Sequence, residues 1–381
     1  MLYLGGITLT LFLVFILLSK KDKSSADKLL TLWLFLTGVH LFFFYVRNTQ
    51  QHLHFPHLLG IEISMPLLHG PFLFLYTSTL TNQQQSWKIN LLHFLPYALS
   101  LLSLIPFFRL SSQQKIYVYQ NEGVGFKLLM TIFLFAFIIS GILYSILSLL
   151  KLSKHRKNIA DQFSFTEKIN LLWLRNLTLG LSLIWLIVIF GDDKHVFTAV
   201  VGYVFFIGYF GINQLGIFTN KPPSLSGTTN QPLSAPQITQ EESKALQAPA
   251  DSKVKYQKSG LDSEKQKAIH QQLTQLMLDQ KLFKVPGLTL RDLAQKLDVQ
   301  PNILSQVINT EEQKNFYDYI NHQRIEEFKQ LIKIPENQKF TLLALALECG
   351  FNSKTSFNRN FKKVTGISPA EYVKQQRITL Q

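Results

Sequence analysis

One stretch decides the fold of the C-terminal part of this chain: residues 348–372, which read ECGFNSKTSFNRNFKKVTGISPAEY. A helix is predicted to end at the start of this stretch, at Leu342–Cys349; it begins after Thr341, and Gly350 takes the turn that follows it. Glycine suits that end because it adopts a left-handed backbone without steric penalty. Asn352 is then predicted to cap a second helix. The stretch therefore predicts two helices joined by a tight turn.

The second predicted helix has one apolar face and one polar, basic face. Phe357 and Phe361 lie four residues apart and so share the buried face. The outward side chains are Lys354, Thr355, Asn358, Arg359, Lys362 and Lys363. In a DNA major groove, Arg359 could bond a guanine bidentately, Asn358 could read an adenine, and Thr355 could meet a thymine methyl. The lysines are better placed for phosphate oxygens.

A similar helix pair is predicted earlier, at residues 288–310. Thr289 is a suitable N-cap, and Pro301 suits the first position of the second helix. Asp298 stands in the turn, where aspartate tolerates positive φ. The outward side chains of this second helix are Asn302, Ser305 and Gln306. The chain thus carries two predicted helix-turn-helix units.

These features resemble the DNA-binding domain of AraC-type transcription regulators, in which one helix joins two helix-turn-helix units. The resemblance covers residues 253–375, and it is most specific in the second unit, 341–364. The residues in family register there and just beyond are Gly350-Phe351, Phe357, Arg359, Phe361-Lys362, Gly366 and Ser368-Pro369. The first unit departs at Asp298, where the family often has glycine. The resemblance implies a linking helix at 314–333 and binding to double-stranded promoter DNA.

Charge distinguishes the two predicted units. Residues 288–338 contain 6 Lys and Arg against 8 Asp and Glu, whereas residues 340–381 contain 6 against 2. DNA phosphates attract cations and repel carboxylates. The second unit is therefore expected to supply most of the electrostatic affinity.

The N-terminal half has a different character, since it is crowded with Leu, Phe and Ile. A membrane-spanning helix takes about 20 apolar residues. Seven such runs are predicted, at 2–19, 29–47, 61–80, 91–109, 125–150, 170–190 and 196–218. The first lacks the basic start and cleavage site of a signal peptide, so it is expected to be retained. Four prolines, Pro66, Pro71, Pro96 and Pro106, are expected to kink or end the third and fourth runs.

The distribution of basic residues predicts the orientation of these runs. Loops after the first, third and fifth runs hold ten Lys and Arg, against five in the other loops and their flanks. Basic loops stay in the cytoplasm. The N-terminus is thus predicted outside a bacterial cytoplasmic membrane and the C-terminus inside, on the side of the chromosome. The fold class predicted for the whole chain is all-α, with a polytopic bundle of about seven spans before an AraC-type domain. In this arrangement the chain resembles the membrane-spanning members of the AraC-type family.

Three polar residues in the membrane half are candidates for sensing, because polar groups in lipid are costly. His40 and His69 are predicted about 10–12 Å from the outer surface, at ~1.5 Å per residue. Glu62, seven residues before His69, is predicted on the same helix face. The group could sense a proton or a metal ion facing outward. The alternative is hydrogen bonding between helices.

The predicted domains are a transmembrane sensor at 1–218, a linker at 219–252 and a DNA-binding domain at 253–381. The linker is rich in Pro, Ser, Thr, Gln and Ala, a composition that cannot bury a core. A flexible linker transmits force poorly. The signal is expected to pass instead through changed pairing of protomers or through release of a docked C-terminal domain.

These features favour a membrane-embedded transcription regulator that senses a signal through its transmembrane half. The partners would be promoter DNA, the lipid bilayer, a second copy in a homodimer, and an unknown small-molecule, ion or membrane-protein signal. The alternative is a transporter or channel with an appended DNA-binding feedback domain. No enzyme, cofactor or metal site is predicted. The single cysteine, Cys349, excludes an intrachain disulfide and a cysteine-based metal site.

Overall fold

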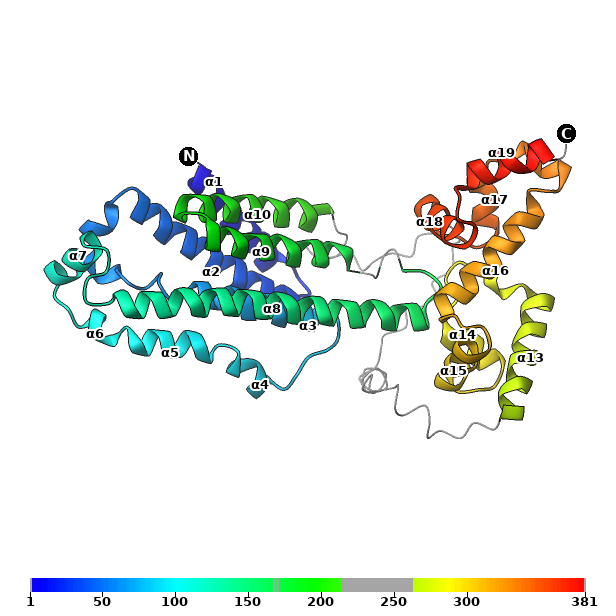
Figure 1. Ribbon diagram of the computed structural model, residues 1–381, viewed down its shortest axis with the longest axis horizontal. Coiled ribbons are helices and arrows are strands. Elements are labelled where there is room, and N and C mark those ends of the chain that lie inside the picture. The colour runs from blue at the N-terminus through cyan, green and yellow to red at the C-terminus, as the bar shows by residue number, and fades with distance from the viewer. Residues whose placement is uncertain (1, 167–168, 170, 214–262, 380–381) are drawn as a thin grey trace. The chain divides into compact units, whose positions relative to one another are not determined.

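The computed structural model describes residues 2–166, 169, 171–213 and 263–379, which form helices joined by turns (Figure 1). These residues divide into two compact units. Of the described residues, the first unit contains 2–153 and 171–213, and the second contains 154–166, 169 and 263–379. Among the described residues, β pairing is limited to one isolated bridge between Phe163 and Thr289. The all-α prediction is confirmed, while the predicted linker at 219–252 lies outside the described residues.

Four helices of the described chain are long and apolar enough to cross a membrane. They are α1 (Leu2–Ser19), α2 (Ser25–Asn48), α8 (Lys127–Gln162) and α9 (Leu172–Phe190). Each coincides with one of the predicted runs. Helix α8 continues well past the predicted end of its run at residue 150.

The other three predicted spans differ from the observed helices. Helix α3 (Pro66–Leu80) has only 15 residues, because the chain before Pro66 forms turns. Helix α10 (Asp193–Asn213) covers the start of the predicted 196–218 run, whose last residues lie outside the described chain. The predicted single helix at 91–109 is wrong, since it is replaced by several short helices.

Those short helices are α4 (Trp87–Leu92), α5 (Leu95–Ser103) and α6 (Ile105–Phe108), followed by α7 (Ser112–Gln120). Pro96 and Pro106 lie in the first turns of α5 and α6. Proline is tolerated there because the first N–H groups of a helix have no intrahelical acceptor. The expectation that these prolines interrupt the helix is confirmed.

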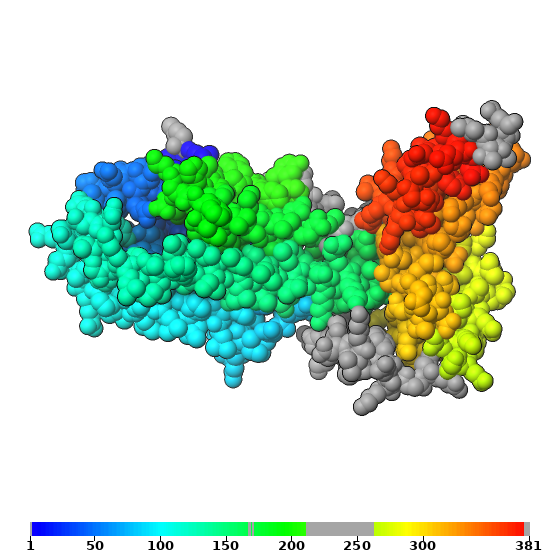
Figure 2. All heavy atoms as spheres, in the orientation of Figure 1, coloured from blue at the N-terminus to red at the C-terminus, as the bar shows by residue number. Residues whose placement is uncertain are grey.

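The first unit packs its helices in contact with one another (Figure 2) while leaving many apolar side chains outside. Helix α1 packs on α2 and α10, α10 packs on α9, and α2 packs on α3. The largest core of the unit includes Leu13, Leu17, Leu30, Trp33, Leu34, Leu73, Leu174 and Leu177. On the outer face, Phe12, Phe15 and Phe190 are 54, 66 and 86% exposed. Such broad apolar exposure is unusual for a domain surrounded by water.

The second unit contains two small cores that share one helix, α16 (Phe316–Leu331). The first core lies among α13 (Ser263–Gln280), α14 (Leu290–Lys296) and α15 (Pro301–Glu311). The second lies between α17 (Leu342–Glu348) and α18 (Lys354–Thr365). The C-terminal helix is α19 (Pro369–Thr379). Helix α16 supplies Phe316 and Ile320 to the first core and Ile325 and Phe328 to the second.

The two helix pairs of this unit are joined by turns with the same hydrogen bonds. After α14, Val299 N donates to Ala294 O at 3.0 Å and Asp298 N donates to Gln295 O at 3.3 Å. After α17, the equivalent bonds run from Phe351 to Ala346 at 3.1 Å and from Gly350 to Leu347 at 2.9 Å. Both are Schellman motifs, which require a left-handed residue at the same position. Asp298 and Gly350 provide it, with φ of 53° and 96°, as expected.

Candidate nucleic-acid interface

Helix α18 presents the polar face that its sequence predicts. Its buried side includes Phe357 and Phe361, which are 2 and 0% exposed. The six predicted contact residues on the other side are exposed: Lys354, Thr355, Asn358, Arg359, Lys362 and Lys363. The predicted cap is wrong by one residue, because the Ser353 side chain accepts from Ser356 N while Asn352 Nδ2 donates to Pro286 O. The turn ends one residue later than predicted, which brings Ser353 to the cap position.

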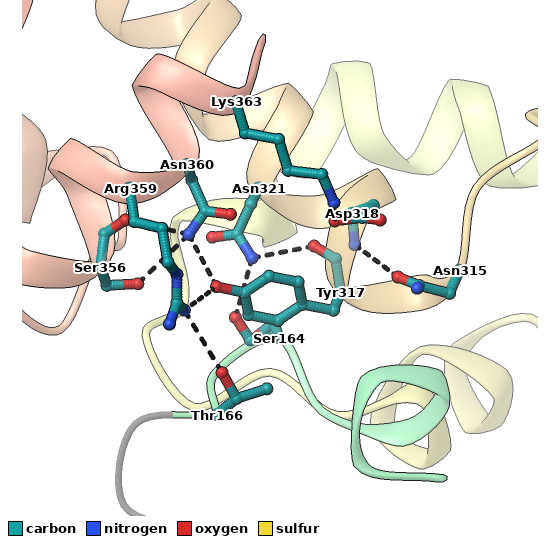
Figure 3. A network of polar contacts seen from close by, with 10 residues as sticks. All are labelled: Ser164, Thr166, Asn315, Tyr317, Asp318, Asn321, Ser356, Arg359, Asn360 and Lys363. Atoms are coloured by element: carbon teal, nitrogen blue, oxygen red, sulfur yellow. Dashed lines mark hydrogen bonds and ion pairs between the residues drawn. The ribbon is translucent and has the colours of Figure 1, made fainter. Parts of the chain in front are cut away.

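Helix α18 is held on α16 by polar contacts beside its outward face (Figure 3). The Tyr317 hydroxyl oxygen accepts from Arg359 Nη2 at 2.6 Å and from Asn360 Nδ2 at 2.7 Å. Lys363 pairs with Asp318 at 2.6 Å. These contacts restrain the direction of the Arg359 side chain while leaving it exposed. A restrained arginine loses less conformational freedom when it binds a base.

Helix α15 presents a smaller and less charged face. Asn302 is exposed, whereas Ser305 and Gln306 are half-buried. Helix α15 contains no Lys or Arg and ends on Glu311, while α18 contains four basic residues and no Asp or Glu. The electrostatic difference expected between the two helix pairs is therefore present at the helix surfaces themselves.

The buried Arg324 on α16 was missed by the sequence analysis. Its side chain is 1% exposed; Nε donates to Phe283 O at 2.6 Å, and Nη2 donates to Val285 O at 2.9 Å. Buried guanidinium groups need such partners, because unpaired charge in a protein interior is costly. Helical spacing could have predicted the burial of Arg324, because it lies four residues from both Ile320 and Phe328 and so shares their face of the helix. Both of those residues are fully buried.

A second contact ties the segment before α14 to α16. Lys281 and Lys284 of that segment pair with Glu327 at 3.0 and 2.8 Å. Burial acts to raise the pKa of the Glu327 carboxyl, but the two lysines outweigh it and hold that pKa below its ordinary value. Together with Arg324, these pairs fix the first helix pair against the shared helix.

In the first unit, the structure brings two of the three candidate sensing residues together. His40 Nδ1 and His69 Nε2 lie 3.0 Å apart, and Trp33 Nε1 donates to His69 Nδ1 at 3.2 Å. Glu62 lies apart from this pair and accepts from the Tyr119 hydroxyl at 2.6 Å. The expectation that Glu62 shares a helix face with His69 is wrong, because α3 begins only at Pro66. Among the described residues, no group of three metal-binding side chains is found.

The second unit has a basic, exposed helix that follows a tight turn after another helix. This arrangement is that of the helical DNA-binding domains. Residues 293–375 match the model of the family described as Helix-turn-helix domain. The resemblance of this part to AraC-type regulators is thereby confirmed.

A relative supports the same conclusion. It is an uncharacterized HTH-type transcriptional regulator, YijO, of Escherichia coli (strain K12), and it is 35% identical over 89 residues. The match covers 23% of this chain and 30% of that protein, so most of each chain lies outside it. No solved structure matches the chain. The C-terminal part is thus a helix-turn-helix domain of the kind that occurs in DNA-binding transcription regulators.

Proposed function

We propose that this chain is a membrane-embedded transcription regulator that binds promoter DNA through two helix-turn-helix units. The units are the pairs α14–α15 and α17–α18, within the proposed boundaries 288–310 and 341–364. The observation that carries the proposal is the outward face of α18, which combines three lysines with Arg359, whose side chain is held by Tyr317. Helix α18 would enter the major groove and supply most of the affinity.

Each outward residue has a role in this proposal. Arg359 would bond a guanine, Asn358 an adenine, and Thr355 would contact a thymine methyl. Lys354, Lys362 and Lys363 would contact phosphates. Lys363 would have to leave its ion pair with Asp318 to do so. The weaker contacts of the first unit would come from Asn302, Ser305 and Gln306.

The spans within residues 1–218 would lie in the bacterial cytoplasmic membrane, with the N-terminus outside, and the domain at 253–381 would lie in the cytoplasm together with the loop after the fifth span. Four apolar helices and their exposed phenylalanines support this placement. Two tethered copies could occupy neighbouring half-sites with raised effective concentration. Residues 219–252 would serve as the linker between the membrane and the DNA.

We further propose that His40 and His69 sense a proton. Trp33 Nε1 can only donate, so His69 Nδ1 accepts. The neutral His69 ring therefore carries its proton on Nε2, where it faces His40 Nδ1. A proton added at either Nδ1 atom would place two donors face to face and break one hydrogen bond. The bonds join α2 to α3, so protonation would loosen that contact. Glu62 would lie outside the sensing pair.

Capture of genomic DNA by the full-length protein in detergent, followed by sequencing, tests the proposed function. Wild type is expected to enrich discrete promoter fragments. Arg359→Glu should abolish the enrichment, because it replaces a base-contacting cation with an anion. Asn302→Ala should weaken it less.

The matched control is Lys267→Glu, which makes the same change of charge on the exposed face of α13. It should retain the enriched fragments. Equal loss in both charge reversals would mean that net charge alone drives binding. No enrichment by folded wild type would exclude the proposed function under those conditions.

A further inference from the structure

The residues that follow α8 pack into the DNA-binding unit. We name Phe163–Thr166 the α8 strap. Its Ser164 is 1% exposed, and both its backbone N–H and its hydroxyl donate to Leu288 O, at 3.2 and 2.7 Å. Phe163 forms the antiparallel bridge with Thr289, the cap of α14. The strap thus lies directly against the start of the first helix pair.

The strap also completes the surroundings of the buried arginine on the shared helix. Arg324 Nη1 donates to Ser164 O at 3.3 Å, and Nη2 donates to Ser164 Oγ at 3.2 Å. Asn321, which is 2% exposed, donates to the same carbonyl at 3.2 Å. A buried serine with this many polar partners occupies a formed site, since such groups are costly to leave unpaired.

The far end of the strap reaches the predicted base-reading side chain, as Figure 3 shows. Arg359 Nη2 donates to Thr166 Oγ1 at 3.4 Å, in addition to its shorter bond to Tyr317. Bidentate contact with guanine requires two N–H donors of one guanidinium group. The guanidinium forms such paired contacts through Nη2 together with either Nη1 or Nε. Because Nη2 already donates to both Tyr317 and Thr166, it must give up one of them before the contact with guanine forms. A seated strap and a guanine compete for the same arginine.

The strap is joined to the membrane half by an unbroken helix. Helix α8 runs from Lys127 to Gln162, and its residues up to Ser153 belong to the first unit. About 12 of its residues follow the predicted end of the span, a length of roughly 18 Å at the rise of an α-helix. The basic-residue pattern predicts a cytoplasmic position for this segment. A helix transmits a shift or rotation that the proposed flexible linker would absorb.

We infer that the α8 strap is an intrachain docking segment that lowers DNA affinity while seated, and that movement of α8 releases it. The inference rests on the proposed function. In the seated state the strap holds Arg359 and fixes the start of α14. In the released state Arg359 is available to DNA.

A disulfide across the bridge between Phe163 and Thr289 tests the inference in the full-length protein. Residues paired across antiparallel strands lie about 4.5–5.5 Å apart at Cα, which is within the range that a disulfide spans. The variant is Phe163→Cys with Thr289→Cys. Cys349 can stay, because it is fully buried and burial raises the pKa of its thiol to about 12.

The probe is the duplex most enriched by genomic capture, and its affinity is measured by fluorescence anisotropy in detergent. If the strap is seated in about 90% of free molecules, the protein with a locked strap and the protein with a released strap should differ in affinity for the duplex by at least about tenfold. The oxidised double variant is expected to bind weakly and to recover on reduction. The Phe163→Cys and Thr289→Cys substitutions made separately should each leave a DNA affinity that does not change on oxidation.

Each outcome has a separate meaning. Failure of the intrachain disulfide to form in membranes, or its formation between two copies, would overturn the docking assignment. A disulfide that forms without changing affinity would overturn the regulatory role. If even the reduced protein binds no genomic fragment, the proposed function itself fails.

Ser164→Lys provides a second variant that needs no oxidation. A lysine there would face the Arg324 guanidinium in a site with no room for it, so the strap should be released. Affinity for the duplex should rise by about tenfold relative to wild type. Ser153→Lys is the matched control, because Ser153 is an exposed serine on α8, the helix that precedes the strap. Unchanged or reduced affinity of a folded Ser164→Lys protein would contradict the inference.

Discussion

At the scale of single residues, the DNA-binding unit depends on Arg324. This one side chain donates to backbone oxygens of Phe283, Val285 and Ser164. Its guanidinium also lies 5.8 Å from the ring centre of Phe351, at the turn of the second helix pair. One buried cation thus joins the segment before α14, the strap and the second turn.

We predict that Arg324→Met destabilises this unit by about 2–4 kcal/mol, because several buried carbonyls lose their donor. The chain offers its own reporter, since Cys349 is its single cysteine and is fully buried in this unit. The rate at which a thiol reagent labels Cys349 in the full-length protein should rise at least about 30-fold. Arg291→Met, at an exposed position of α14, should label at nearly the wild-type rate. Equal rates in the two variants would show that Arg324 contributes little.

At the scale of secondary-structure elements, the repeated turn is the informative feature. The two Schellman turns share their hydrogen bonds but differ in how tightly they are enclosed. A Cβ at Gly350 would lie 2.7 Å from the carbonyl oxygens of both Phe283 and Lys284. The side chain of Asp298 is exposed. Glycine is therefore required in the second turn for two reasons, and aspartate suffices in the first.

We predict that Gly350→Ala costs about 2–4 kcal/mol, because left-handed strain adds to a clash with backbone atoms. Asp298→Ala should cost no more than about 1 kcal/mol, because an alanine there meets left-handed backbone strain but no clash with neighbouring atoms. Protease resistance of the C-terminal unit in the solubilised full-length chain measures both, because cleavage follows the population of opened molecules. If Asp298→Ala proved as protease-sensitive as Gly350→Ala, the enclosure of the second turn would not explain its glycine.

At the scale of the whole molecule, the proposed sensing pair and the DNA-binding unit must communicate. We predict that His69→Phe removes the response of a target promoter to external pH in living cells, because the ring can no longer accept from Trp33 or bond His40. The reporter is the promoter identified by genomic capture. The solubilised variant should keep its affinity for DNA.

His57→Phe is the control, since His57 is exposed in η2 (Pro56–Leu58), after η1 (Gln51–His54), and has no part in the pair. It should respond to pH as wild type does. A normal pH response from His69→Phe would remove this pair from the signalling proposal. It would leave the DNA-binding proposal intact.

Much of the second unit was predictable because its information is local. Thr289 accepts a bond from Asp292 N as a cap, Pro301 begins α15, and the outward residues of α18 follow from the position of its two phenylalanines. The cap of α18 was misassigned because Asn352 and Ser353 are both good caps, and only the length of the turn decides between them. The span at 91–109 failed because hydropathy records composition, whereas prolines divide the backbone.

The sequence by itself determined the helical class, the two helix pairs with their turns and the basic face of α18. Each of these follows from spacing of 3.6 residues, from capping and from backbone preferences that neighbouring residues impose on one another. Only the tertiary structure decided which distant residues meet. It brought His40 to His69, separated Glu62 from both, and placed Ser164 against Arg324 across 160 positions of chain. Such contacts depend on how distant helices pack against one another, and no pattern among neighbouring residues predicts that packing.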